Sequence, residues 1–168
     1  SGLSSTQVGY LETADLAKLA TSTLNALVAS QLPGLKAAQV TALSSTQVEA
    51  LTSSFVGSLS IDQVKAISSS NVGALTTSNV VGLTTAQIAA LTTAQLGSLT
   101  SAQMAGISTS NLGRISSSNI ATLSTAQFGS LTTLSVRGFM PVQVAALSAE
   151  QIASLSTHAL VALSTAQL

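Results

Sequence analysis

Residues 83–106 read LTTAQIAALTTAQLGSLTSAQMAG, three near-copies of one eight-residue phrase. The spacing runs through the whole chain, because every eighth residue from Leu3 onward is large and apolar, and so is the sixth residue of each octad. Twenty complete octads and a six-residue remainder follow one another without an insertion or a deletion. Such strict spacing is typical of repeat architectures, in which each unit packs on its neighbours.

A period of eight argues against a single long helix. Eight helical residues advance about 800°, so an apolar stripe would wind around the helix instead of facing one core. A β-solenoid is the alternative fold, because coils rich in Thr, Asn and Val suit it. Strands, however, place apolar residues two apart, whereas the apolar gaps here alternate between five and three.

Short capped helices account for all the fixed positions together. The second residue of the octad is Ser or Thr in 16 of 21 cases, and the fifth is Gln or Asn in 16 of 21. A hydroxyl followed three residues later by Gln is the pattern of a capping box, as in Thr84 with Gln87 and Thr92 with Gln95. The apolar first and sixth positions then pair as a hydrophobic staple, and glycine at seven or eight ends the helix.

We therefore predict an all-α solenoid, a superhelical coil with one short capped helix per octad, with a β-solenoid as the alternative. Its core is expected from the first and sixth positions, with small residues at seven and eight allowing close approach. One domain is predicted over residues 1–168, with irregular repeats at 11–34, regular repeats at 35–168 and an irregular zone at 131–144. Flanking repeats of the same parent protein are expected as packing partners.

Two zones depart from the pattern. Residues 11–34 lose the cap at Ala20 and Val28, so a longer helix is expected there, with a break at Pro33. Pro141 falls on the first helical position, where proline is well tolerated. The zone 131–144 also carries Arg137, Phe139 and Met140, which form a possible contact patch, although a degenerate repeat is the simpler interpretation.

Composition restricts the function. Charged residues make up 6% and aromatic residues 2% of the chain, and the formal net charge is zero. The surface is therefore expected to consist of Ser, Thr, Gln, Asn and Ala, without the basic residues and stacking aromatics that nucleic-acid binding needs. No stretch is long and apolar enough to predict a membrane-spanning helix, and the N-terminus lacks the features of a signal peptide.

No catalytic, cofactor or metal site is predicted, and the chain is not expected to be an enzyme. His158 is the only histidine, cysteine is absent, and five acidic residues are scattered. This set offers neither a metal-binding cluster nor a nucleophile paired with a base. No glycine-rich phosphate loop occurs either. His158, at the fourth position of its octad, is expected to be a solvated side chain.

The tandem phrase L-[ST]-[ST]-x-Q-[VILM]-x-x resembles the octad arrays of very large bacterial secreted or surface proteins of the adhesin-like kind. The resemblance covers residues 3–168 and is best at 83–106 and 123–130. It implies an extracellular or cell-surface stalk or scaffold, and it transfers no catalytic or binding residue.

Three functions remain open from the sequence. The leading one is a structural spacer or scaffold, with possible self-association through the open ends of the coil. The second is a binding module that holds a peptide or a glycan in a solenoid groove. The third, binding of an ordered surface such as ice by rows of threonine, requires a flat β face.

Overall fold

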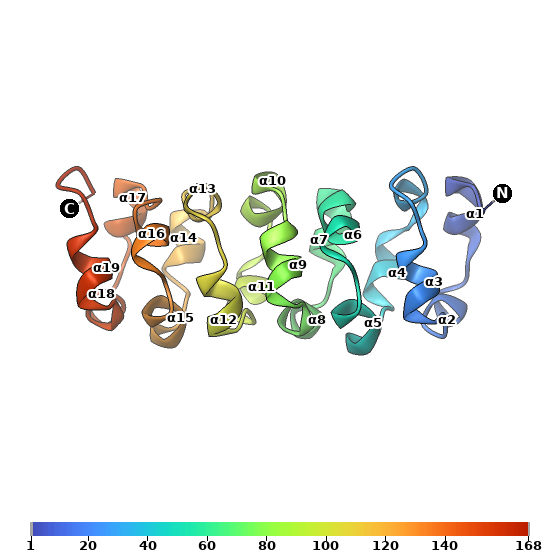
Figure 1. The fold of residues 1–168 in the computed structure, drawn as a ribbon, viewed down its shortest axis with the longest axis horizontal. Helices are drawn as coiled ribbons and strands as arrows, with labels where there is room; N and C mark the ends of the chain where they lie inside the picture. The colour runs from blue at the N-terminus through green and yellow to red at the C-terminus, as the bar shows by residue number, and fades with distance from the viewer. Residues whose placement is uncertain (1, 168) are drawn as a thin grey trace. The chain divides into compact units, whose positions relative to one another are not determined.

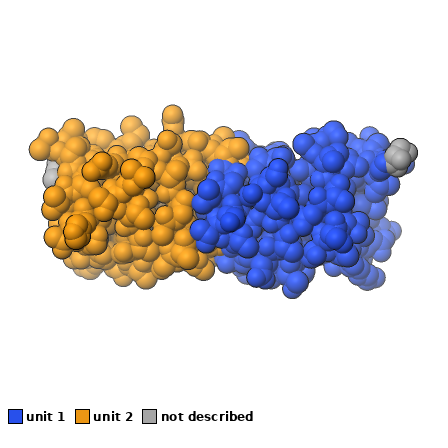
Figure 2. All heavy atoms as spheres, viewed as in Figure 1, with its two compact units in different colours: residues 1–83 blue, residues 84–168 orange. Residues whose placement is uncertain are grey.

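The computed structural model describes residues 2–167, and in this part of the chain all regular secondary structure is helical. The chain divides into two compact units, residues 1–83 and 84–168, which are shown in separate colours in Figure 2. The predicted all-α repeat solenoid is therefore confirmed, and the β-solenoid alternative is wrong. The ice-binding idea, which needs a flat β face, loses its basis with it.

Each of the twenty complete octads contributes one short helix (Figure 1). The first unit holds α1 (Ser5–Tyr10), α2 (Thr13–Leu16), α3 (Thr21–Asn25), the 3-10 helix η1 (Leu32–Gly34), α4 (Ala37–Thr41), α5 (Ser45–Glu49), α6 (Ser53–Ser58), α7 (Ile61–Ala66), α8 (Ser69–Ala74) and α9 (Thr77–Gly82). The second unit holds α10 (Thr85–Ala89), α11 (Thr93–Gly97), α12 (Ser101–Ala105), α13 (Thr109–Leu112), α14 (Ser117–Ile120), α15 (Thr125–Gly129), α16 (Thr133–Val136), α17 (Pro141–Val144), α18 (Ala149–Ser154) and α19 (Thr157–Val161).

The chain turns between helices without left-handed backbone. The residue before each α-helix is extended, as at Thr84 (φ −68°, ψ 160°), and the first position of the octad is extended as well, as at Leu83 (φ −65°, ψ 134°). No residue in the described range, glycine included, has a positive φ. Glycine at positions seven and eight is therefore not needed for the turn, in contrast to the sequence prediction.

Three octads make one turn of the solenoid. Within each unit a helix packs against the helix three octads away, as α4 does with α7, α5 with α8, α13 with α16 and α15 with α18. One coil therefore consists of three successive octads, and the helices of every third octad form a column. One column in each unit contains all the basic residues of that unit, and we call it the cation column. It comprises α2, α4 and α7 in the first unit and α10, α13, α16 and α19 in the second.

The core contains the first and sixth positions of the octad, as predicted. Ile88 is fully buried and Leu91 is 2% exposed, and the same holds for their counterparts in most coils. Glycine pairs from successive coils allow close contact between these coils: Gly9 with Gly34, Gly57 with Gly82, and Gly113 with Gly138. A Cβ atom on Gly113 would lie 2.6 Å from the carbonyl oxygen of Gly138.

The irregular N-terminal repeats contain shorter helices, not the longer one predicted. α2 has four residues and α3 has five, and Glu12 and Ala20 precede them without a side-chain cap. Pro33 lies within η1, so this octad holds a 3-10 turn in place of an α-helix. Glu12 and Ala20 still adopt the extended conformation that precedes the other α-helices, so the chain turns at these positions and no helix runs through them.

The zone 131–144 follows the regular pattern despite its unusual residues. Thr132 caps α16, and α17 begins at Pro141 as predicted. Over the described residues, no helix is long and apolar enough to cross a membrane.

Candidate functional site

The polar residues that the sequence singled out join neighbouring parts of the same chain. Gln87 donates its backbone N–H to Thr84 Oγ1 (3.2 Å), and Thr84 donates its backbone N–H to Gln87 Oε1 (2.7 Å). Thr92 and Gln95 form the same reciprocal pair at 3.3 and 3.0 Å. Each pair occupies two backbone N–H groups that a helix start leaves without a partner.

The fifth-position glutamine has a second role, which we call the coil bond. In α15, Gln127 is buried, and its Nε2 donates to the backbone oxygens of Leu96 (2.9 Å) and Leu99 (2.8 Å), one coil earlier. The same pair of bonds, 31 and 28 residues back, is made by Gln39, Gln47, Gln63, Gln143, Gln151 and Gln167. One amide thus joins the start of its own helix to the preceding coil.

These bonds correct the expected composition of the surface. Nine of the fifth-position glutamines are only 1–5% exposed, so these side chains belong to the interior: Gln39, Gln47, Gln63, Gln87, Gln95, Gln103, Gln127, Gln143 and Gln151. No buried side-chain nitrogen or oxygen among the described residues lacks a hydrogen-bond partner. The surface therefore consists mainly of Ser, Thr and Ala.

Asparagine at the fifth position distributes its bonds differently. The Asn119 Nδ2 donates to the backbone oxygen of Leu91 (3.2 Å), while its Oδ1 accepts from the Thr93 hydroxyl (2.8 Å) of the preceding coil. Asn71 does the same with Leu43 and Ser45. In these two octads the shorter side chain keeps one coil bond and its oxygen turns to the neighbouring coil. Asn79 also keeps one coil bond, to the Leu51 oxygen, but its Oδ1 accepts the backbone N–H of Thr76 at its own helix start (3.0 Å).

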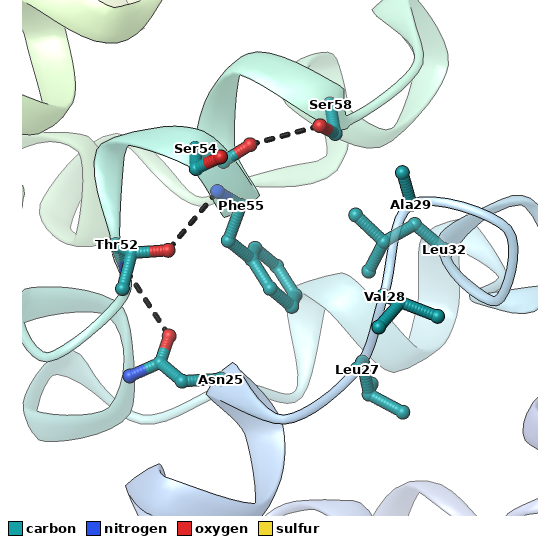
Figure 3. A pocket seen from close by; sticks show the side chains of 9 residues that line it. All are labelled: Asn25, Leu27, Val28, Ala29, Leu32, Thr52, Ser54, Phe55 and Ser58. Carbon is teal, nitrogen blue, oxygen red and sulfur yellow. Dashed lines mark hydrogen bonds between the residues drawn. The ribbon is translucent and has the colours of Figure 1, made fainter. Parts of the chain in front are cut away.

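Phe55 interrupts the series and forms one wall of a pocket of about 290 Å³ (Figure 3). Its ring points from α6 toward Val28 and Leu32 of the irregular repeat. Phenylalanine cannot accept the Thr52 backbone N–H, and Asn25 from the preceding coil takes this role through Oδ1 (3.1 Å). Its Nδ2 also donates to the Ala50 backbone oxygen. The pocket therefore lies where phenylalanine takes the fifth position and Asn25 supplies one hydrogen bond of the capping pair.

The predicted contact patch does not form as one surface. Arg137 and Met140 are exposed, but Phe139 is only 3% exposed. Phe139 occupies the first position of its octad, and its ring stacks on that of Phe128 with 5.9 Å between the centroids. It is a core residue, like the buried first-position residues of the neighbouring octads, Leu123 and Leu131.

All the basic residues lie on one face of each unit. Lys18, Lys36 and Lys65 belong to the octads of α2, α4 and α7, and Arg114, Arg137 and His158 to those of α13, α16 and α19. All six octads are in the cation column. Lys36 also lies over the Tyr10 ring, with Nζ 5.8 Å from its centroid. The other two columns of each unit carry no basic residue.

The second unit has the less balanced charge on this face. Glu150 is the only acidic residue of residues 84–168, and it lies outside the cation column, in α18. Arg137 and His158 line a surface depression of about 440 Å³ together with Thr133, Thr157, Val161 and Ala162. The octads of the cation column in the second unit therefore carry no acidic residue.

The titratable groups of the described residues are dispersed along the chain. No group of three or more His, Cys, Asp or Glu residues lies close enough together there to hold a metal ion. The pKa of Glu150 lies below its ordinary value, because backbone and Ser148 hydrogen bonds favour the charged carboxylate. This effect belongs to the start of α18, where Ser148 is the residue before the helix.

Comparison with known proteins supports the tandem repeat. Residues 8–45 and 77–109 match the family model of the ALTTAQ repeat. Together the two stretches cover less than half of the chain. No curated protein and no solved structure matches it.

Proposed function

We propose that the chain is a structural repeat segment, a spacer or scaffold of a secreted or cell-surface bacterial protein. The observation that carries this proposal is the coil bond. In both units the buried fifth-position glutamine donates hydrogen bonds from one coil to the preceding coil, so the polar groups of the interior hold the stack of coils together. A spacer needs such a uniform contact between its coils and needs no ligand site.

The location and the adhesin-like parent are supported by the likeness of the octad phrase to surface-protein arrays. A chain with few charges and many hydroxyl groups suits such an array. Flanking repeats of the same parent protein would continue the stack through further coil bonds, since each coil needs only its neighbour.

The spacer role is tested by changing the number of coils. Deleting residues 91–114 removes three whole octads and leaves the octad spacing intact. We expect the variant to fold, and its largest dimension in small-angle X-ray scattering to fall by one step. Duplicating the same segment should add a step of equal size. Unequal steps, or loss of helical circular dichroism in both variants, would contradict a modular spacer.

A binding module is the second candidate, because all basic residues lie in the cation column. The depression between α16 and α19 combines Arg137 and His158 with the hydroxyls of Thr133 and Thr157. Cations beside hydroxyl groups suit the carboxylates of an acidic glycan or peptide.

Titration with a uronic-acid oligosaccharide tests this candidate. Binding should weaken in Arg137→Gln and persist in Lys18→Gln, which removes the same charge from the other unit. Equal affinity of both variants would remove the support for a binding face.

A further inference from the structure

The irregular fourth octad leaves a space between two inner coils of the first unit. No α-helix occupies residues 27–34, whereas every other octad of this unit has one. On the opposite side, α6 carries Phe55 at the fifth position, and the pocket of about 290 Å³ lies between these two octads. We call it the Phe55 pocket. Because α1 packs on η1 and α9 packs on α6, both of its walls belong to coils inside the stack.

The backbone oxygen of Leu27 lacks its usual partner at this place. In regular coils the oxygen of the first position accepts from the fifth-position side chain 28 residues later, as Leu99 does from Gln127 (2.8 Å). The residue at this distance from Leu27 is Phe55, which has no donor. Leu27 is half-buried and lines the pocket, and its oxygen receives no hydrogen bond from any residue that the structure describes. The missing donor therefore has to come from water or from a ligand.

The lining of the Phe55 pocket indicates what kind of ligand it fits. Apolar and hydroxyl-bearing side chains predominate, and none of the lining residues is charged. The Phe55 ring forms one wall and points toward Val28 and Leu32 on the other side (Figure 3). A cavity of about 150 Å³ holds benzene, so a pocket of about 290 Å³ has room for one or two rings. These features suit a flat, uncharged and mainly apolar molecule.

The equivalent place in the second unit also has a hollow, but its acceptor is satisfied. Ser135 takes the fifth position there and lines a space of about 340 Å³ together with Ile107 and Thr132. The Ser135 hydroxyl donates to the Ile107 oxygen (3.0 Å), so the carbonyl 28 residues earlier has a partner. Of these two hollows, the Phe55 pocket alone combines an aromatic wall with an acceptor that no described residue pairs.

We propose that the Phe55 pocket binds a small, uncharged aromatic molecule with one hydrogen-bond donor, of the class of indole or a phenol. The donor takes the place of the missing glutamine amide at the Leu27 oxygen, and the ring packs between Phe55 and the side chains of Val28 and Leu32. Such a ligand displaces water from the pocket and reproduces the hydrogen bond that water makes. This site goes beyond the scaffold role, because it depends on two octads that depart from the repeat.

Nuclear magnetic resonance of the full chain tests the proposed hydrogen bond directly. The sequence contains only two Leu-Val pairs, Leu27–Val28 and Leu160–Val161, so labelling leucine with ¹³C at the carbonyl and valine with ¹⁵N gives two carbonyl-to-amide signals. Titration with indole should shift the Leu27 carbonyl signal until it saturates, and leave that of Leu160 in place. Benzofuran has the same shape without the N–H donor, and should bind at least about fivefold more weakly.

Variants of the pocket provide the second test, with indole as the probe. Phe55→Gln removes the aromatic wall and supplies a side-chain donor for the Leu27 oxygen, so indole binding should be lost while the helical circular dichroism remains. Val28→Ser removes apolar surface from the other wall and should weaken binding at least about threefold. Val81→Ser is its matched control, because Val81 is 57% exposed like Val28 but lies in α9, outside the pocket. It should leave the affinity unchanged.

Several results would overturn the proposal: no saturable shift of the Leu27 signal, equal shifts at Leu27 and Leu160, equal affinity for indole and benzofuran, or undiminished binding to Phe55→Gln. Equal weakening by Val28→Ser and Val81→Ser would do the same. The coil deletion at residues 91–114 lies outside the pocket, so its scattering reports the spacer role independently of ligand binding.

Discussion

At the scale of single residues, the fifth position of the octad separates two roles that the sequence pattern combines. A capping box accepts Glu as well as Gln, since only an oxygen must reach back to the helix start. Yet none of the 21 octads has Glu at this position. The coil bond explains the absence, because it needs the amide NH₂ as a donor to two backbone oxygens, and a carboxylate has no donor.

The close glycine contacts give a prediction with a matched control. A Cβ on Gly138 would lie 2.0 Å from the Thr109 backbone oxygen, so Gly138→Ala must push two coils apart. We expect a loss of about 1–3 kcal/mol in the free energy of unfolding. Gly97→Ala is the control, because nothing lies within 4 Å of its Cβ position, and it should be neutral or stabilising by up to about 1 kcal/mol. Denaturant unfolding measures both, and equal effects would show that the glycine contact is unimportant.

Phe55 and Asn25 should be energetically coupled. Asn25→Ala leaves the Thr52 N–H and the Ala50 oxygen without their side-chain partner, at a cost of about 1 kcal/mol. In a Phe55→Gln background the new glutamine can bond to Thr52 N–H, so Asn25→Ala should cost less. A double-mutant cycle in denaturant unfolding should give a coupling energy of at least about 0.5 kcal/mol. Strict additivity would mean that Asn25 does not replace the missing glutamine.

At the scale of the element, a helix of four to six residues is too short to be stable alone. Its start is held by the hydroxyl and amide of its own octad, and its sides by the coils before and after. Capping chemistry predicts the starts of the helices well. The octad spacing, the residue before each helix and the position of Pro141 at the start of α17 all follow from it. Capping chemistry predicts α2 and α3 poorly, because the chain turns at Glu12 and Ala20 although neither side chain caps the helix that follows.

Gln127→Glu tests the coil bond within one helix. The carboxylate keeps the acceptor for the Ser124 N–H but faces the Leu96 and Leu99 oxygens from a buried position. We expect a loss of about 2–4 kcal/mol at neutral pH. Burial and the facing carbonyls raise the pKa of the introduced carboxyl, so the penalty is full above that pKa and decreases as the pH falls below it.

The control for this variant is Ala126→Glu, which adds the same charge to the exposed neighbouring position. It should change the free energy of unfolding little, as the native Glu150 at the same octad position indicates. Measurement by denaturant unfolding at pH 7 and pH 4 separates the two. A similar small effect of both variants would contradict a donor role of Gln127.

At the scale of the whole molecule, the number of octads per turn is the feature that the repeat pattern hides. Identical octads would fit a coil of two, three or four, because each pairing places Leu against Leu. Only the residues that depart from the consensus indicate how many octads make one turn. These are the glycine pairs that meet between successive coils, and the basic residues, which share one column when every third octad is aligned. The fold of each octad was therefore predictable from the regular positions, whereas the cation column needed the structure.

A disulfide between neighbouring coils tests the three-octad turn directly, because the chain has no cysteine of its own. The Thr93 hydroxyl lies 2.8 Å from the Asn119 Oδ1, so Thr93→Cys with Asn119→Cys should form an intramolecular disulfide on mild oxidation. Closing a loop of this length should raise the free energy of unfolding by about 3 kcal/mol if the bond is unstrained. Thr93→Cys with Asn111→Cys is the matched control, since Asn111 has the same octad position one repeat earlier and belongs to a different column. Mass spectrometry of the oxidised monomers distinguishes them, and a disulfide in the control pair but not in the first would mean that two octads, not three, complete one turn.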